Sequence, residues 1–296
     1  MYPILEAESI APDVRRIVVE APKVAKKHRA GQFVIVRVTP NGERIPLTIA
    51  ESDTEAGSIT LFVQAIGRTT MLLCELEPGD CLVDVAGPLG RASEINRYAG
   101  VAVVVGGGVG TAIAYPIACA LAAEGNRVIA IIGGRTKEYV LLEDQLRSHG
   151  IEVIPCTDDG SYGRKGFVTE ALIDVVADEN VAVVFTIGPV PMMAAVAEVT
   201  RADEIETVAS LNPIMVDGTG MCGGCRVEVG GETKFACVDG PEFNAHEVDF
   251  RLLQRWNTSY RAFETGQLED LKSLDAEHHE QLLAPVRGVC ARTALS

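Results

Sequence analysis

The sequence predicts a small antiparallel β-barrel, then a doubly wound α/β domain, then a short cysteine-containing segment and a helical tail. Three observations support this order. Residues 1–98 hold short β-branched runs separated by turn residues, a pattern typical of small barrels. From about residue 100, apolar strands alternate with helical patterns, as in a parallel sheet covered on both faces. Three cysteines then lie close together between residues 222 and 237.

The barrel is assigned to residues 1–98. Its strands are expected where β-branched residues are most frequent, because such side chains suit a pleated, half-buried surface. A short helix is expected within Thr69–Leu76, just before the turn Glu77–Asp80. The four expected strands are Arg15–Glu20, Gln32–Val38, Ser58–Gln64 and Cys81–Ala86.

The α/β domain is assigned to residues 99–210. Its first strand, Val101–Val105, is continuously apolar, which is typical of a strand buried on both faces. A glycine-rich turn and an apolar helix follow it, and the alternation then repeats. Helices are expected near residues 110–124, 140–149, 168–177 and 191–201, and further strands at 128–132, 152–155, 181–187 and 206–211.

Composition narrows the classes of protein. The chain has 296 residues, of which 47% are hydrophobic and 23% charged, as in a soluble globular protein. A formal net charge of −15 argues against nucleic acid and anionic membranes as partners. We expect no signal peptide and no membrane insertion, since neither a basic start with an apolar run nor a spanning apolar stretch is present. The predicted location is the cytoplasm.

Eight cysteines are spread widely along the chain rather than in a dense framework. Five of them have no local partner pattern, so we expect buried free thiols in a reducing compartment. These five are Cys74, Cys81, Cys119, Cys156 and Cys290.

The segment 211–240 carries the most specific motif. Asp217, Cys222, Cys225 and Cys237 are separated by four, two and eleven residues, with glycines between them. Thiolates at this spacing suit a [2Fe–2S] cluster better than zinc, with Asp217 in the first ligand position. Three other interpretations stay open: a Cys222–Cys225 redox disulfide, a structural zinc site with a distant fourth ligand, or inert thiols. Asp217 before a glycine is also an ordinary turn residue.

A nucleotide site is predicted where the first strand of the α/β domain meets its helix. Gly106–Gly108, Gly110 and Thr111 form a turn whose backbone N–H groups suit a pyrophosphate. Thr111 stands where the dinucleotide fingerprint needs glycine or alanine, so the strict motif fails, and a plain tight turn is the alternative. At the next strand end, Arg135 suits a 2′-phosphate, and no acid is present there to hold a 2′-hydroxyl.

Further candidates follow other strands. Asp158 and Gly188 come at later strand ends, where ligands bind in open α/β sheets. In the barrel, Arg44 is placed to pair with a phosphate and Thr48 to hydrogen-bond a flavin ring, while Gly67–Thr70 offers backbone and hydroxyl donors to a second phosphate. Each of these segments alone is typical of an ordinary loop.

The tail, residues 241–296, is predicted to be polar and helical, with Trp256 and Tyr260 in a charged run. It buries little core of its own. The sequence leaves open whether it packs on the chain's own domains or contacts a partner subunit.

Taken in order, these motifs resemble the ferredoxin–NADP reductase superfamily. The order is Arg44–Thr48, Gly67–Thr70, Gly87–Gly90, the glycine turn of residues 106–112, and Gly188-Pro189 followed by Met192. With the cysteine segment added, nearly the whole chain resembles the electron-transfer subunits of dihydroorotate dehydrogenase. It resembles more closely the small (alpha) subunits of NADH-dependent reduced ferredoxin:NADP oxidoreductases, also described as sulfide dehydrogenase subunits. Asp217 fits the second group, because the dihydroorotate type has four cluster cysteines. Ile187 departs from the superfamily, in which many members carry cysteine beside the nicotinamide.

The resemblance implies the cofactors FAD, a [2Fe–2S] cluster and NAD(H), with NADP(H) left open by Arg135. It implies cluster ligation by Asp217, Cys222, Cys225 and Cys237. The implied FAD contacts are Arg44, Pro46, Leu47, Thr48, Gly67, Thr69 and Thr70. The implied nucleotide contacts are Gly107, Gly108, Gly110, Thr111, Arg135, Asp158 and Gly188.

The implied activity is that of a flavin oxidoreductase. A hydride passes between the nicotinamide and the flavin, and electrons then move singly to the cluster, so no catalytic acid or base is assigned. The implied partner is a large subunit with a second flavin and [4Fe–4S] centres, where electrons from NADPH are split between ferredoxin and NAD in a heterodimeric complex. Two alternatives remain: the same module serving dihydroorotate or another dehydrogenase, and a non-catalytic redox-sensing or zinc-binding protein.

Overall fold

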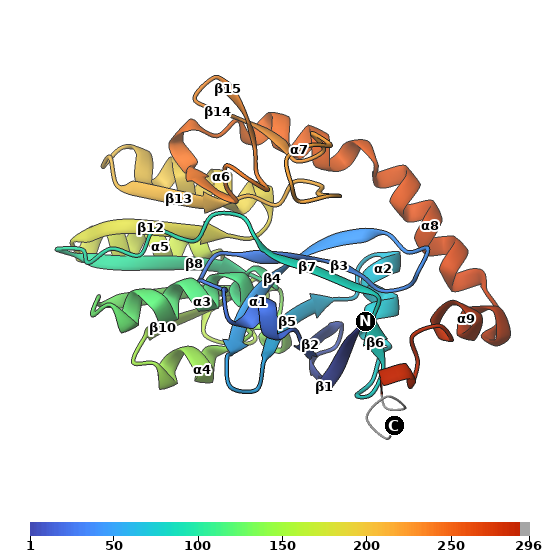
Figure 1. The fold of residues 1–296 in the computed structure, drawn as a ribbon. Helices are drawn as coiled ribbons and strands as arrows, with labels where there is room; N and C mark the ends of the chain where they lie inside the picture. The colour runs from blue at the N-terminus through green and yellow to red at the C-terminus, as the bar shows by residue number, and fades with distance from the viewer. Residues whose placement is uncertain (291–296) are drawn as a thin grey trace.

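The structure is a computed structural model that describes residues 1–290 (Figure 1). It confirms the predicted fold class. An antiparallel seven-stranded sheet curls into the barrel, with strand order β6-β1-β2-β5-β4-β3-β7. The barrel elements are β1 (Tyr2–Ala11), β2 (Val14–Glu20), α1 (Pro22–Ala25), β3 (Phe33–Arg37), β4 (Arg44–Asp53), β5 (Ser58–Gln64), α2 (Arg68–Cys74), β6 (Cys81–Leu82) and β7 (Asp84–Leu89).

Two barrel strands were not predicted, β1 and β4. Polar residues such as Glu6 and Glu8 interrupt the apolar pattern of β1, which pairs along β2 in a hairpin. β4 begins with Arg44 and contains Pro46, which lies opposite Ile35 of β3. Proline and charge disfavour a strand locally, so these strands depend on pairing with their neighbours rather than on their own propensity.

The second sheet is built as a doubly wound α/β domain. Its strand order is β11-β10-β9-β8-β12-β13-β16, parallel throughout except that β16 runs antiparallel to β13. Its elements are β8 (Val101–Gly107), α3 (Gly110–Ala123), β9 (Val128–Gly134), η1 (Lys137–Tyr139), α4 (Glu143–Ser148), β10 (Glu152–Thr157), β11 (Arg164–Lys165), α5 (Val168–Asp178), β12 (Val181–Ile187), α6 (Val190–Arg201), β13 (Glu206–Ser210) and β16 (Glu242–Asn244).

Helices cover both faces of this sheet, which explains the continuously apolar strands. α3 and α4 pack on one face, where Ala102 and Val104 of β8 point. α5 and α6 pack on the other, against Val103 and its neighbours. The helix expected over residues 140–149 is shorter, because Leu142 adopts a left-handed conformation with φ of 61° and α4 begins only after it.

The strand order changes direction between β8 and β12. The chain leaves β8 toward β9 on one side and later returns to β12 on the other. This is the topological switch point, and ligands of open α/β sheets bind outside the carboxyl ends of the strands there.

The cysteine segment forms a small hairpin, β14 (Arg226–Val229) and β15 (Glu232–Phe235). The chain then returns to the second sheet as β16, within residues that the sequence placed in the helical tail. The rest of the tail is helical and comprises η2 (Ala245–Glu247), α7 (Phe250–Ser259), α8 (Arg261–Ser273) and α9 (Ala276–Leu283).

The described tail packs on the chain's own domains. In Figure 1, α7 and α8 form a long arch that runs from the hairpin across to the barrel. Leu253 of α7 is buried in the core that surrounds the cysteine segment. Leu271 of α8 and Leu283 of α9 are buried in the barrel core.

A disulfide joins Cys81 of β6 to Cys290 beyond α9. The expectation of free thiols was therefore wrong for these two residues. The two cysteines are 209 residues apart in the sequence, so no local sequence pattern predicts that they pair. Cys74, Cys119 and Cys156 are free thiols, and Cys156 is fully buried.

No helix within residues 1–290 has both the length and the apolar character needed to cross a lipid bilayer.

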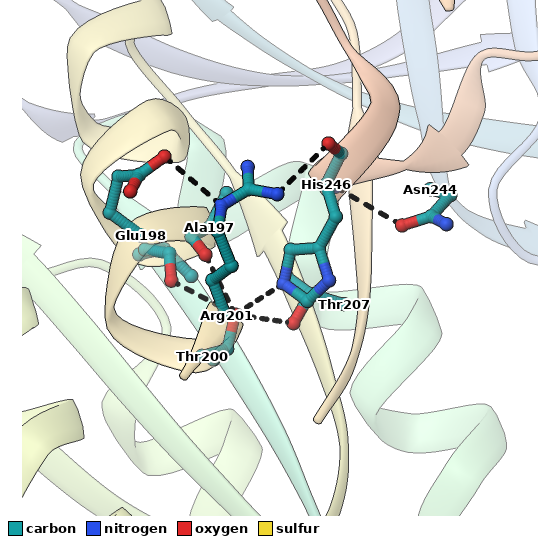
Figure 2. Close-up of polar contacts among 8 residues, drawn as sticks. Ala197, Glu198, Thr200, Arg201, Thr207, Asn244 and His246 are labelled. Carbon is teal, nitrogen blue, oxygen red and sulfur yellow. Dashed lines mark hydrogen bonds and ion pairs between the residues drawn. The ribbon is translucent and has the colours of Figure 1, made fainter. Parts of the chain in front are cut away.

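A polar cluster fixes the return of the chain from the hairpin onto α6 (Figure 2). Thr200 Oγ1 lies 3.0 Å from His246 Nε2 and accepts a hydrogen bond from Thr207 Oγ1 at 2.7 Å. Arg201 Nη1 donates to the carbonyl oxygen of His246 at 3.2 Å. Burial, and then the charge of Arg201, lower the pKa of His246 and so disfavour a charged ring beside the buried hydroxyl.

Thr200→Val tests this cluster. The substitution preserves shape but leaves His246 Nε2 without its partner, and an unsatisfied buried polar group costs about 1–3 kcal/mol. We expect the thermal midpoint to fall by roughly 2–6 °C. Thr258→Val, at an exposed hydroxyl bonded only to carbonyl oxygens of its own helix, is the control and should change the midpoint by about 1 °C or less. Equal midpoints for the two variants would contradict this role.

A second polar contact joins β16 to the segment between the two domains. Ser93 Oγ donates to Glu242 Oε1 at 2.5 Å. Burial raises the pKa of Glu242 to about 7, so the folded chain favours the protonated carboxyl group. Because the folded pKa lies above the unfolded one, this contribution to stability is complete below the unfolded pKa and is lost as pH rises through about 7.

Glu242→Gln should remove that loss, because the amide stays neutral at every pH. We expect the variant to match the parent protein at pH 5 and to exceed its thermal midpoint by about 2–4 °C at pH 8. Glu124→Gln, at the exposed end of α3, should keep the parental pH profile. A parental profile in Glu242→Gln would show that the buried carboxyl group has no such linkage.

Candidate functional site

A cavity of about 1060 Å³ lies at the switch point, between the second sheet and the barrel. The ends of β8, β9 and β12 form one wall and β4 forms the facing wall. Typical pockets for one small ligand measure about 300–1,000 Å³, so this volume suits more than one ring system.

The glycine turn after β8 lines the cavity with Gly107, Gly108 and Gly110. A Cβ atom on Gly110 would lie 2.5 Å from the carbonyl oxygen of Ile187. Glycine is therefore required for α3 to begin so close to the end of β12. Thr111, also predicted as a contact, is fully buried behind the turn and does not line the cavity.

Three other predicted residues reach the same cavity from different strand ends. Arg135 follows β9, Asp158 follows β10 and Gly188 follows β12. Ile187 also lines the cavity and is almost fully buried.

The predicted barrel residues divide into two groups. Pro46, Leu47, Thr48 and Thr70 line the cavity. The others, Arg44, Gly67 and Thr69, lie outside its lining.

The second group is linked through the start of β4. Arg44 Nη2 lies 3.5 Å from Asp84 Oδ2. Thr69 Oγ1 donates to Oε2 of Glu43, the neighbour of Arg44, at 3.1 Å. The start of α2 is therefore bonded to the start of β4, beside the cavity rather than in it.

Among the four predicted cluster ligands, the structure brings Cys225 and Cys237 into contact and links Asp217 to the backbone of Cys222. Cys225 Sγ lies 3.2 Å from Cys237 Sγ, and both residues are buried. Asp217 accepts backbone hydrogen bonds from Thr219 at 2.8 Å and from Cys222 at 2.9 Å. These bonds, Thr219 first, lower the pKa of the Asp217 carboxyl group.

Cys225 with Cys237, and Asp217 with Cys222, would supply the two ligand pairs of a two-iron centre. Within residues 1–290, no three His, Cys, Asp or Glu side chains are placed to hold one metal ion, and this includes the four predicted ligands. A [2Fe–2S] cluster takes two protein ligands at each iron, whereas structural zinc takes four ligands at one ion. Backbone N–H groups also face the sulfur atoms, from Gly224 to Cys222 and from Cys237 to Cys225, each at 3.5 Å.

The cysteine segment approaches the barrel closely. Gly218 has φ of 74°, and a Cβ there would lie 2.6 Å from Leu89 Cδ1 and 3.1 Å from Ile35 Cγ1. Only glycine accommodates both the conformation and the contact. Met215, three residues before this glycine, lines the cavity and shares a core with Cys225. The cavity and the cysteine segment are therefore in direct contact.

Sequence reasoning missed several lining residues. Phe33, Phe62, Tyr139 and Phe167 supply aromatic walls. Asp13 lines the cavity from the tip of the β1–β2 turn, where proline and aspartate look like an ordinary turn. Ser210–Pro213 also line it, and their position after the last parallel strand was a usable signal, since such strand ends meet at one edge.

Comparisons with known protein families match the barrel and the cysteine segment. Residues 2–93 match the oxidoreductase FAD-binding domain family. Residues 212–249 match the iron–sulfur cluster binding domain of dihydroorotate dehydrogenase B.

Two curated relatives span most of the chain. A Thermotoga maritima homologue of the dihydroorotate dehydrogenase B (NAD(+)) electron transfer subunit is 45% identical over 258 residues, covering 87% of this chain and 91% of its own. The electron transfer subunit of Geobacillus thermodenitrificans is 34% identical, with 83% and 96% covered.

Among solved structures, the NADH-dependent reduced ferredoxin-NADP oxidoreductase, studied for flavin-based electron bifurcation, contains a similar chain. It is 42% identical, with a TM-score of 0.87 and 92% of this chain and 98% of that chain covered. Phthalate dioxygenase reductase, at 18% identity and a TM-score of 0.56 over 77% of this chain and 85% of its own, shares the fold.

Cys225→Ala tests the assignment of the cluster ligands. Loss of one thiolate should reduce iron in the purified protein from about two atoms per chain to under half of that, with loss of the visible cluster absorbance. Cys119→Ala removes a free thiol on α3, far along the chain from the segment, and should leave iron content unchanged. Parental iron in the Cys225 variant would exclude it as a ligand.

Proposed function

The chain belongs to the family of dihydroorotate dehydrogenase B electron-transfer subunits, and we propose that it is the flavin/iron–sulfur subunit of an electron-bifurcating ferredoxin:NADP oxidoreductase. The observation that carries this proposal is the single cavity that contacts both the flavin-type barrel and the glycine turn, with Met215 of the cluster segment in its wall. Support for the bifurcating type comes from the 42% identical solved relative and from aspartate at the first ligand position.

The residues present fit the three cofactors. Pro46, Leu47 and Thr48 on β4, with Thr70, would hold FAD, while Arg44, Gly67 and Thr69 beside them complete the proposed flavin contacts. The turn Gly107–Gly110, with Thr111 behind it, would hold the nucleotide together with Arg135, Asp158 and Gly188. When bound, FAD exchanges a hydride with NAD(H) and passes electrons singly to the [2Fe–2S] cluster.

The chain's own residues orient these groups and exclude water. Phe33, Phe62, Ile187 and Met192 make the walls where the two rings would meet largely apolar, and a water-poor site protects the transferred hydride. Backbone N–H groups and close glycine contacts fix the nucleotide without a charged partner for every oxygen.

We propose that the large partner subunit docks at the exposed edge of the cluster segment. The proposed ligands Cys225 and Cys237 are 1% and 2% exposed and share a core with barrel residues Phe33 and Ile35. Cys222 is exposed, and its neighbour Met221 is 89% exposed. The cluster therefore has an inner side toward the flavin cavity and an outer side toward a partner, which in the resembled complexes carries a second flavin and [4Fe–4S] centres and reduces ferredoxin.

A second candidate function is electron transfer to a dihydroorotate dehydrogenase, favoured by the names of the curated relatives and by the match over residues 212–249. The large subunit that co-purifies with the chain decides between the two. A bifurcating partner brings [4Fe–4S] iron and a second flavin, whereas a dihydroorotate-type partner oxidises dihydroorotate.

The test of the proposed activity is the visible spectrum of the anaerobic protein during titration with NADH and, separately, NADPH. We expect flavin bands and broad iron–sulfur absorbance that NADH bleaches at least about tenfold faster than NADPH. A colourless protein, or a coloured one that neither nucleotide bleaches, would overturn the proposal.

A further inference from the structure

The second strand of the nucleotide domain lacks the acid that such domains use to select NAD. In dinucleotide-binding folds a carboxylate at this strand end accepts the ribose 2′-hydroxyl, whereas arginine accommodates a 2′-phosphate. Here β9 is followed by Arg135, which lines the cavity. Judged from this domain alone, the chain would favour the phosphorylated nucleotide.

A carboxylate reaches the same cavity from the barrel instead. Asp13 lies at the tip of the tight turn between β1 and β2 and lines the cavity. Its Oδ2 accepts a hydrogen bond from Gln64 Nε2 at 2.9 Å, and its carbonyl oxygen accepts one from Ala65 N at 2.8 Å. The end of β5 therefore holds the carboxylate in a fixed position.

The other carboxylate oxygen of Asp13 is unsatisfied. Oδ1 is buried and accepts no hydrogen bond from residues 1–290. A buried acceptor without a donor lowers the stability of the free protein. A bound ligand that donates a hydrogen bond to this oxygen removes that penalty. Asp158, the other acid that lines the cavity, is exposed and can be hydrated.

The surroundings of Asp13 place it beside the nucleotide domain. Burial, then the negative charge of Asp13 and a side-chain hydrogen bond to it, raise the pKa of the Tyr139 phenol, while the positive charge of Arg135 lowers it. The phenol therefore lies against the Asp13 side chain, whose Oδ1 has no hydrogen-bond partner within residues 1–290. Tyr139 follows β9 in the 3₁₀ turn η1 and also lines the cavity. The phenol thus lies within reach of an anion from the barrel and a cation from β9.

We propose that Asp13 Oδ1 accepts the adenosine ribose hydroxyl of the nicotinamide nucleotide and sets a preference for NAD(H) over NADP(H). The inference rests on the proposed function, because it assigns a specificity residue to the same cavity. A hydroxyl supplies the donor that Oδ1 lacks. A 2′-phosphate offers only acceptors and negative charge at neutral pH, so beside the half-buried carboxylate of Asp13 it is repelled. Asp13 thereby offsets the attraction of Arg135 for phosphate.

The experiment is calorimetric titration of the FAD-loaded chain with NAD⁺ and with NADP⁺, for the parent protein, Asp13→Asn, Asp13→Ala and Glu8→Gln. The asparagine variant keeps an acceptor but loses the charge, and the alanine variant loses both. Glu8→Gln removes an exposed charge from β1 outside the cavity and should match the parent.

We expect Asp13→Asn to lower the NAD⁺ over NADP⁺ preference by at least about tenfold, mainly by tighter NADP⁺ binding. Asp13→Ala should also weaken NAD⁺ binding by about tenfold or more.

Three results would overturn the inference. They are an unchanged preference in both Asp13 variants, a loss of FAD with the preference retained, and an equal effect in Glu8→Gln. A loss of FAD would assign the carboxylate to the flavin's own ribose. Flavin absorbance and the thermal midpoint of each variant establish that the protein is folded and loaded. Because the readout is binding, it stands even where the chain fails to pass electrons, which keeps failure of the inference separate from failure of the proposed function.

Discussion

The arrangement depends on one shared hydrophobic core. Phe33 and Ile35 of the barrel, Met193 and Ala197 of α6, and Cys225 of the cluster segment are buried in a single cluster of side chains. Such interiors are packed as closely as organic crystals and tolerate little displacement. The barrel, the α/β domain and the cysteine segment therefore keep fixed relative positions, as the proposed single-electron transfer between two bound groups requires.

Further contacts attach the cysteine segment and the tail to the two domains. β16 returns from the cysteine hairpin to pair with β13, and the hydroxyl of Thr200 holds His246 against α6. The tail extends the same connection, because α7 contributes to the core around the cysteines while α8 and α9 contribute to the barrel core. The sequence did not show whether the tail packs on its own chain or on a partner. In the structure the tail connects the core around the cysteines to the barrel core.

Sequence pattern predicted the fold class and most of the second domain because its strands and helices carry strong, local apolar periodicity. It did not predict β4, because Pro46 and charged residues weaken the strand pattern there and the strand forms by pairing with β3. It also did not predict the disulfide between Cys81 and Cys290, because these residues are distant in sequence. Only those parts of the candidate site that carry a local sequence motif were predicted. Glycine turns and clustered cysteines are local signals, whereas Asp13 and Tyr139 acquire their meaning only when two domains face each other across the cavity.

The central claim is that electrons from the nucleotide reach the cluster only through the flavin. The most direct measurement is rapid freeze-quench electron paramagnetic resonance after mixing with NADH, for FAD-loaded protein and for the same protein stripped of FAD. The account predicts a reduced [2Fe–2S] signal that follows flavin bleaching in the loaded protein and is absent from the stripped protein. A cluster signal that develops at the same rate without FAD, or no signal in the loaded protein, would contradict it.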